Sequence, residues 1–258
     1  MIDTFRTAFA SEYYKLSKNK ELVGLVFVPV TLTVLVAGYL YYDLSQNMAE
    51  EIDGSINPWK GVLGKVVFQF FYLLYPILVA IFVHACCDVE YKNNNYKVLF
   101  TLPVSKFKIF ISKVLFVLIA VLLSVSLSYV TFLVCGYLLS RILPEIGFQN
   151  YDFRNVAFFV YLKLYIALAA ISSIQLCLSL QFKNFIYPIG FGMFLLVFSM
   201  VVWQKDFSDF IPYTGSFKSY INLLGENTLF ERLDYLNLCS VFVFLFGSFY
   251  LFKRKIHH

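Results

Sequence analysis

The chain has 258 residues, of which 60% are hydrophobic and only 14% are charged, and its formal net charge is +5. Soluble domains are nearer to half apolar and roughly 25% charged, so this composition excludes an ordinary soluble protein and predicts an integral membrane protein. The positive charge does not indicate nucleic-acid binding, because the basic residues flank long apolar segments, a pattern that sets membrane topology.

The first 20 residues contain an amphipathic helical pattern. Apolar residues recur at spacings of three and four, and charged residues take the other side. The apolar positions are Ile2, Phe5, Phe9, Tyr13 and Leu16. Such a helix lies in the headgroup region with its aromatic face toward the lipid. The alternative is a cytosolic tail that is helical only by propensity.

Six apolar segments follow, each close to the length of about 20 residues that crosses the hydrocarbon core of a bilayer. They cover residues 22–42, 66–87, 114–139, 156–180, 185–203 and 235–252. The predicted fold class is therefore an all-α membrane protein with six transmembrane helices. Pro29, Pro76 and Pro188 fall within these segments, where proline bends a helix.

The connecting segments differ in charge. Residues 88–113 hold five lysines against Asp88 and Glu90, whereas residues 43–60 are mainly acidic. Basic segments stay on the cytoplasmic side of a membrane. We therefore expect both termini, residues 88–113 and the turn at 181–184 to be cytoplasmic. The segments at 43–60, 140–155 and 204–234 are then outside.

Several polar and amphipathic features have structural interpretations. The outer segment 204–234 predicts two short helices, around residues 207–213 and 217–224, that dip into the outer leaflet and either cap a path or anchor the protein. Lys163 lies near the outer end of the fourth segment and is expected to extend to the interface. Hydroxyl and amide side chains in the third and fourth segments are expected to bond neighbouring helices. These are Ser124, Ser128, Thr131, Ser172, Ser173, Gln175 and Ser179.

No metal site, cofactor or disulfide framework is expected. The five cysteines lie in or beside apolar segments, where they serve as small packing residues. His84, Cys86 and Cys87 are close in sequence, but helical neighbours point about 100° apart and no further histidine or cysteine completes a set of ligands.

Residues 88–113 are the most informative stretch for function. Residues 91–100 can form a short helix with Tyr96, Leu99 and Phe100 on its apolar sides, and Leu102 is driven out of the α region by the following Pro103. Ser105 can then cap a helix that begins at Lys106. Such a corner suits the docking of a cytosolic partner; an amphipathic connector lying on the membrane is the equal alternative.

A family resemblance is carried by these same residues, in the run Glu90…Leu99-Phe100-Thr101-Leu102-Pro103-Val104-Ser105…Lys113. It resembles the cytosolic loop of type-2 ABC exporter permeases, in which an acidic residue, a coupling helix, a Leu-Pro-Val-Ser turn and a lysine precede the third span. Residues 1–21 are similar to that family's cytoplasmic elbow helix, and residues 22–258 to its six-span permease domain. The small permeases of lantibiotic and bacteriocin immunity and export systems look most similar.

The resemblance implies a set of partners. The chain would pair with a second permease subunit, identical or different, and with two cytosolic ABC ATPase subunits, in the inner membrane of a bacterial cell. Tyr96, Leu99, Phe100, Leu102 and Pro103 would form the surface that couples to the ATPase, and Glu90 would brace the loop against the elbow helix. No G-x-x-x-x-G-K-[ST] motif occurs in the sequence, so ATP hydrolysis is assigned to the partner and the chain itself is not expected to be an enzyme.

The same resemblance places the transport path between two permease subunits that meet through their first and fifth spans. Pro188, Gly190 and Gly192 in the fifth segment permit close approach and bending there. Ordinary packing within one subunit is the alternative for these three residues.

Two other classes of function compete with an exporter of a hydrophobic peptide, drug or lipid-like compound. A membrane-embedded enzyme is excluded by the lack of paired carboxylates, an H-E-x-x-H motif or a Ser/His couple within the apolar segments. An ion-coupled carrier or channel, or a membrane scaffold without an ATPase, is the second alternative. A carrier ordinarily has intramembrane acidic residues or an inverted repeat, and none is visible in the six predicted segments.

Overall fold

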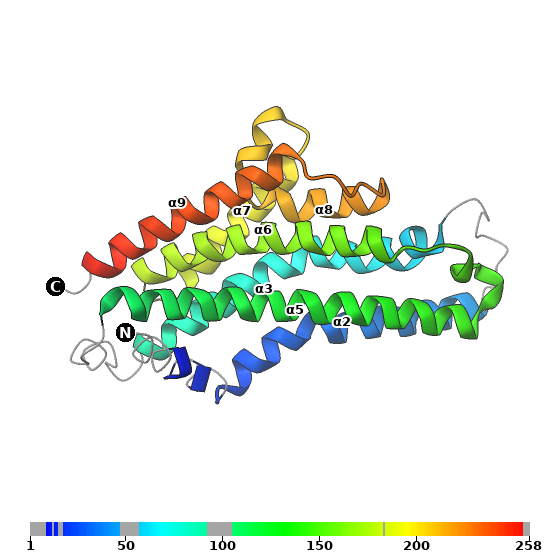
Figure 1. Cartoon of the computed structure of the whole chain (residues 1–258), viewed down its shortest axis with the longest axis horizontal. Coiled ribbons are helices and arrows are strands. Elements are labelled where there is room, and N and C mark those ends of the chain that lie inside the picture. The colour runs from blue at the N-terminus through cyan, green and yellow to red at the C-terminus, as the bar shows by residue number, and fades with distance from the viewer. Residues whose placement is uncertain are drawn as a thin grey trace.

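The computed structural model describes residues 9–11, 13–14, 18–46, 57–91, 105–182 and 184–254, and it places most of them in helices that run along one axis (Figure 1). The helices are α2 (Lys20–Gln46), α3 (Lys65–Tyr91), α5 (Lys106–Ile142), α6 (Arg154–Gln181), α7 (Ile186–Val202), α8 (Thr214–Leu224) and α9 (Arg232–Arg254). Short turns join them: the π-helical η1 (Trp59–Gly64) and the 3-10 turns η3 (Pro144–Ile146), η4 (Phe148–Asn150) and η5 (Asp206–Phe210).

Five of the described helices are long and apolar enough to cross a bilayer. They cover Leu22–Ser45, Trp59–Val89, Lys106–Ile142, Arg154–Gln181 and Arg232–Lys253. The fifth predicted segment corresponds to α7, a shorter apolar helix of 17 residues. The predicted all-α class is therefore confirmed for the described residues, with five helices of spanning length and one shorter apolar helix. The interfacial helix predicted for residues 2–20 lies largely outside the described residues and stays a prediction.

One helix begins earlier than predicted, because the second starts at Trp59 instead of residue 66. The third begins at Lys106, where the turn at Ser105 predicts a helix start, and so extends beyond the span predicted from residue 114. Glycines before residue 66 and lysines before residue 114 predicted that the two membrane spans begin after them. A helix can nevertheless extend beyond the hydrocarbon core as long as its backbone hydrogen bonds are made. The 37 residues of α5 extend over about 55 Å at 1.5 Å per residue, against a hydrocarbon core of about 30 Å.

The core of the bundle surrounds α6. This helix packs against α3, α5, α8 and α9. In its most apolar 18-residue stretch, 78% of the residues are buried. In contrast, α2 packs on α5 and α3, α7 packs mainly on α3, and both leave many apolar side chains exposed. The periphery is thus built from α2, α7 and α9.

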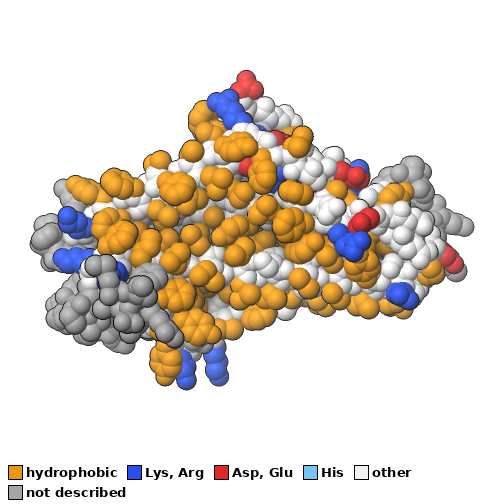
Figure 2. All heavy atoms as spheres, in the orientation of Figure 1, with side chains coloured by type: hydrophobic (Ala, Val, Ile, Leu, Met, Phe, Trp, Pro, Cys, Tyr) orange, Lys and Arg blue, Asp and Glu red, His pale blue; other side chains and the backbone are white. Residues whose placement is uncertain are grey.

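In Figure 2 charged side chains lie toward the two ends of the molecule and on the projection at the top, and orange apolar side chains cover much of the surface between them. We call one end the basic end; α3, α6 and α9 end there, and α5 and α7 begin there (Figure 1). Its described lysines are Lys18, Lys20, Lys106, Lys108 and Lys253. We call the opposite end, with η3 and η4, the far end.

The far end is closed by a buried tryptophan. The Trp59 ring is 2% exposed, and its Nε1 donates to the Phe148 carbonyl at 2.9 Å. Four aromatic rings surround it, those of Phe132, Tyr137, Phe148 and Phe153. Its remaining side is filled by Gly136 of α5, where a Cβ atom would overlap the indole. At the surface nearby, hydrogen bonds from Arg154 hold the pKa of the Asp152 carboxyl below its ordinary value.

The segment between α7 and α9 differs from the prediction. It contains η5 and α8, and α8 packs against α3 and α6 with Thr214, Gly215, Ser216 and Ser219 buried. The amphipathic pattern is real, but its buried side faces protein and carries small polar residues. The predicted pair of lipid-anchoring helices is therefore wrong at α8.

Candidate functional site

The segment predicted to dock a cytosolic partner is joined to the bundle by α3 and α5 at the basic end (Figure 1). Ser105 has extended backbone, with φ −64° and ψ 138°, and its carbonyl accepts the amides of Lys108 and Ile109. The predicted start of a helix at Lys106 is confirmed. The predicted side-chain cap is wrong, because Ser105 makes no capping hydrogen bond through its hydroxyl.

The residues predicted to couple to an ATPase cannot be placed. Tyr96, Leu99, Phe100, Leu102 and Pro103 lie outside the described residues. Glu90 belongs to α3 by its backbone, and its side chain is also outside the description. Their coupling roles stay predictions.

The two helices that carry this segment are joined by Lys113. Its side chain is 2% exposed, and Nζ donates to the Cys86 carbonyl of α3 at 2.9 Å. Lys113 is one of the five lysines between residues 88 and 113, but it lies within α5 and faces α3. A hydrogen bond from a charged donor contributes about 1.5–3 kcal/mol, so this contact fixes the last turns of α3 against α5.

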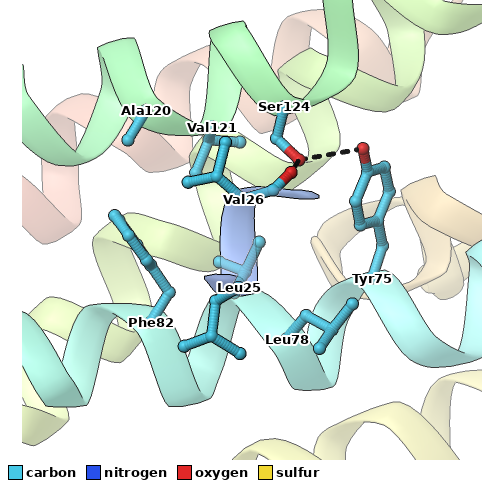
Figure 3. A pocket seen from close by; sticks show the side chains of 9 residues that line it. Leu25, Val26, Tyr75, Leu78, Phe82, Ala120, Val121 and Ser124 are labelled. Atoms are coloured by element: carbon cyan, nitrogen blue, oxygen red, sulfur yellow. Dashed lines mark hydrogen bonds between the residues drawn. The ribbon is translucent and has the colours of Figure 1, made fainter. Parts of the chain in front are cut away.

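A second junction lies further along the bundle, where α2, α3 and α5 meet (Figure 3). Pro29 has no amide hydrogen, so the Leu25 carbonyl one turn earlier lacks its usual backbone hydrogen bond in α2. Within that turn, the Val26 carbonyl accepts a hydrogen bond from Ser124 Oγ of α5 at 2.7 Å. The side chain of Ser124 thus ties α2 to α5 at this point.

Tyr75 of α3 completes this junction. Its hydroxyl lies 3.3 Å from Ser124 Oγ and 2.9 Å from Ser128 Oγ. Beside it is a cavity of about 20 Å³ whose wall, apart from Tyr75 and Ser124, is apolar (Figure 3). That is room for about one water molecule, so the cavity is too small for a transported compound and the junction is structural.

The predicted bonding of hydroxyl and amide side chains between helices is confirmed in part. Ser124, Ser128 and Gln175 reach other helical elements, the last by donating from Nε2 to the Tyr213 hydroxyl at 2.6 Å. In contrast, the hydroxyls of Thr131, Ser172 and Ser173 donate to carbonyls of their own helices. The spacing of these residues predicts which side of the helix they share, but it does not predict which atom accepts each hydrogen bond.

The three residues singled out on α7 have different surroundings. Pro188 and Gly192 are buried, and a Cβ atom on Gly192 would overlap Gln175 Nε2 and lie 3.2 Å from the Tyr213 hydroxyl. Gly190 has no atom within 4 Å of such a Cβ. Gly192 therefore allows α7 to approach α6 and the start of α8 within the subunit, and Gly190 is left open to an outside partner.

An exposed apolar face runs along α3 and α7. Phe70 and Leu73 of α3 are exposed three residues apart, so they form a short apolar stripe, with the polar Gln69 exposed beside it. On α7, neighbouring rings of Phe191, Phe194 and Phe198 lie 6.4 and 6.1 Å apart, and all three are exposed. Lipid or another apolar surface must cover these residues.

Two charged side chains lie inside the bundle, and the position of one of them, Lys163, was wrongly predicted. Lys163 is 1% exposed, and its Nζ reaches the Asn227 carbonyl at 3.5 Å, so it points into protein and not to the membrane interface. Asp234 lies in the first turn of α9, is 4% exposed and accepts the Glu231 amide at 2.9 Å. Buried acidic residues within spans are typical of ion-coupled carriers, which were one of the alternatives. Asp234 instead caps the start of α9, because its carboxylate accepts the amide of the residue that precedes the helix.

Metal binding has no support in the described part of the chain, where no three His, Cys, Asp or Glu side chains cluster closely enough to hold an ion. His84, Cys86 and Cys87 are buried in α3. The contacts that Trp59, Tyr75 and Lys113 make between helices were not predicted. An aromatic residue or a lysine within a mostly apolar helix does not indicate which atom it will contact.

Comparison with known proteins gives one family. A family model described as ABC-2 family transporter protein matches residues 8–199. The match includes α2 to α6, most of α7 and the whole segment between α3 and α5. Neither the curated proteins nor the solved structures contain a match to this chain.

Proposed function

Because the chain belongs to the ABC-2 transporter family, we propose that it is the membrane subunit of an ATP-driven exporter that moves a hydrophobic peptide, drug or lipid-like compound across a bacterial inner membrane. The family match over residues 8–199 is the observation that carries this proposal. The chain is a multi-pass membrane permease. We further propose its direction of transport, its class of substrate and its partner subunits.

Energy is supplied by a separate subunit in this account. The sequence has no P-loop motif, so ATP is bound elsewhere. We assign two cytosolic ABC ATPase subunits, which dock on residues 91–104 through Tyr96, Leu99, Phe100, Leu102 and Pro103, with Glu90 bracing the loop. The joined ends of α3 and α5 support this assignment, because the Lys113–Cys86 contact lets a force on the segment move both helices together.

The transport path is assigned to the face of α3 and α7, with a second permease subunit opposite. Exposed aromatic residues on α7 and the stripe on α3 supply an apolar lining suited to a hydrophobic compound. Gly190 permits close approach of the second subunit, because nothing fills the space beside it. Pro188 and Gly192 contribute by holding α7 against its own subunit.

Transport in proteoliposomes tests this function. The chain is reconstituted with its ATPase subunit, and movement of a fluorescent hydrophobic peptide is followed with ATP and, separately, with an ion gradient alone. The proposal predicts movement that requires ATP and stops when the Walker A lysine of the ATPase is replaced. Movement driven by the ion gradient without ATP would identify the carrier alternative instead.

A further inference from the structure

Two unusual backbone conformations face each other at the far end, one before α3 and one after α8. The chain enters α3 through the π-helical turn η1, and the Lys65 amide donates to the Lys60 carbonyl five residues earlier. Glu226, which follows α8, has φ 54° and is the only described residue other than glycine with a positive φ. Both conformations are sparsely populated in proteins and persist only where their surroundings hold them.

Glu226 occupies the left-handed position that ends α8, where glycine is the usual residue. Its amide donates to the Leu223 carbonyl at 3.2 Å, and the Asn227 amide donates to the Asn222 carbonyl at 2.9 Å. Glycine would make the same two bonds without the steric cost of a Cβ atom. The contacts of the glutamate side chain therefore offset that cost.

The carboxylate of Glu226 joins the end of α8 to η1. Its Oε1 lies 3.3 Å from Lys60 Nζ and accepts a hydrogen bond from Asn57 Nδ2 at 3.4 Å. The side chains of the ion pair are 30% and 40% exposed, so the pair is weak and can separate. Next to it, Leu223 is fully buried, and a Cβ atom on Gly64 would lie 2.6 Å from its Cδ2. A weak polar contact thus lies beside a closely packed apolar contact between η1 and α8.

We propose that Asn57, Lys60 and Glu226 form an outer latch, which holds the start of α3 against the end of α8 while the permease is closed to the outside, and which separates during export. The proposal rests on the proposed function, because α3 is one of the helices assigned to the transport path. Separation of Glu226 removes the contact that holds both unusual conformations, so η1 and the turn after α8 can rearrange together. A weak, partly exposed ion pair suits this role, since each transport cycle breaks and remakes it.

Hydrogen exchange of the full chain in nanodiscs tests the outer latch without an ATPase. Glu226→Gln should raise the exchange rate of the η1 amides about two- to fivefold through loss of the ion pair. Glu226→Gly should raise it equally, whereas a role confined to the left-handed turn would leave the glycine variant unchanged. Lys60→Glu combined with Glu226→Lys should return exchange toward the wild-type rate. The matched control is Asp152→Asn, which breaks an ion pair between residues two positions apart and should leave η1 exchange unchanged.

A cross-link tests whether the outer latch has to open. Lys60→Cys and Glu226→Cys are introduced after the five native cysteines are replaced, and a short bis-methanethiosulfonate joins them in proteoliposomes that contain the ATPase subunit. ATP-driven movement of the fluorescent hydrophobic peptide should stop and should return after reduction. The same reagent applied to Asp152→Cys with Arg154→Cys joins neighbours in one segment and should not slow transport.

Transport that continues across a complete cross-link would overturn the proposal. Unchanged η1 exchange in Glu226→Gln, or no recovery in the charge-swapped chain, would also overturn it. If the wild-type chain shows no ATP-driven transport, the proposed function fails and the role of the latch in export fails with it. The exchange rates still measure the contact between η1 and α8 in that case, so the two failures are distinguishable.

Discussion

Replacement of Gly136 by alanine should destabilise the far end of the bundle. Gly136 lies in α5 where a Cβ atom would overlap the ring of Trp59, with even Cε3 only 2.8 Å away. The ring has little freedom to move, because its Nε1 is bonded to the Phe148 carbonyl and four aromatic rings surround it. The indole must leave its site or α5 must bend.

The magnitude follows from three contributions. Overpacking of a filled core costs about 1–3 kcal/mol, and loss of the Trp59–Phe148 hydrogen bond costs about 1 kcal/mol. The higher helix propensity of alanine returns about 1 kcal/mol. The net loss is therefore about 1–3 kcal/mol, which for a chain of this size corresponds to a fall of roughly 3–9 °C in Tm.

Thermal unfolding in detergent, followed by tryptophan fluorescence, measures this effect. Gly38→Ala and Gly247→Ala are matched controls, because both glycines lie in helices and nothing in the subunit would contact the added methyl group. We expect these controls to unfold at or above the wild-type temperature. A Gly136→Ala protein as stable as the controls, with its tryptophan emission unchanged, would refute the packing described for the far end.

Three further predictions concern the inner contacts and the topology. Ser124→Ala should lower the free energy of unfolding by about 1 kcal/mol through loss of its hydrogen bond to the Val26 carbonyl, whereas Thr131→Ala, which removes a bond within α5 only, should have less effect in the same assay. Lys113→Glu buries a carboxylate against the Cys86 carbonyl and should cost about 3–5 kcal/mol; gel filtration should show loss of the monodisperse protein, while the exposed Lys253→Glu should elute as wild type. In a cysteine-free chain, an impermeant thiol reagent added to whole cells should label Asn150→Cys at the far end and not Ser105→Cys, and the reverse pattern would invert the proposed orientation.

The sequence predicts the helices better than their ends. Apolar length identifies each span, because only a helix satisfies its backbone in lipid. The sequence also predicts the start of α5 at Lys106, but it does not reveal that a π-helical turn continues α3 back to Trp59. Charged residues end the hydrocarbon-crossing part of a helix, whereas the helix itself continues as long as its side chains find partners.

The contacts of buried side chains could not be predicted from the sequence either. Lys113 and Lys163 looked like lysines at the ends of spans, yet both are buried against carbonyls of distant segments. The amphipathic pattern of α8 was correct, but a pattern does not distinguish a face turned to lipid from one turned to α3 and α6. Gly192 likewise signalled a close approach without naming Gln175 as the neighbour.

The central claim is that a cytosolic ATPase drives this permease through residues 88–113. It is tested most directly by co-purification of the ATPase with the wild-type chain and with the double variant Leu99→Asp, Phe100→Asp. The matched control is Leu229→Asp, Phe230→Asp, a pair of the same residue types that is exposed away from the basic end. We predict that the ATPase is lost with the first double variant and retained with the control. Retention with both, in chains that elute as folded protein, would contradict the account.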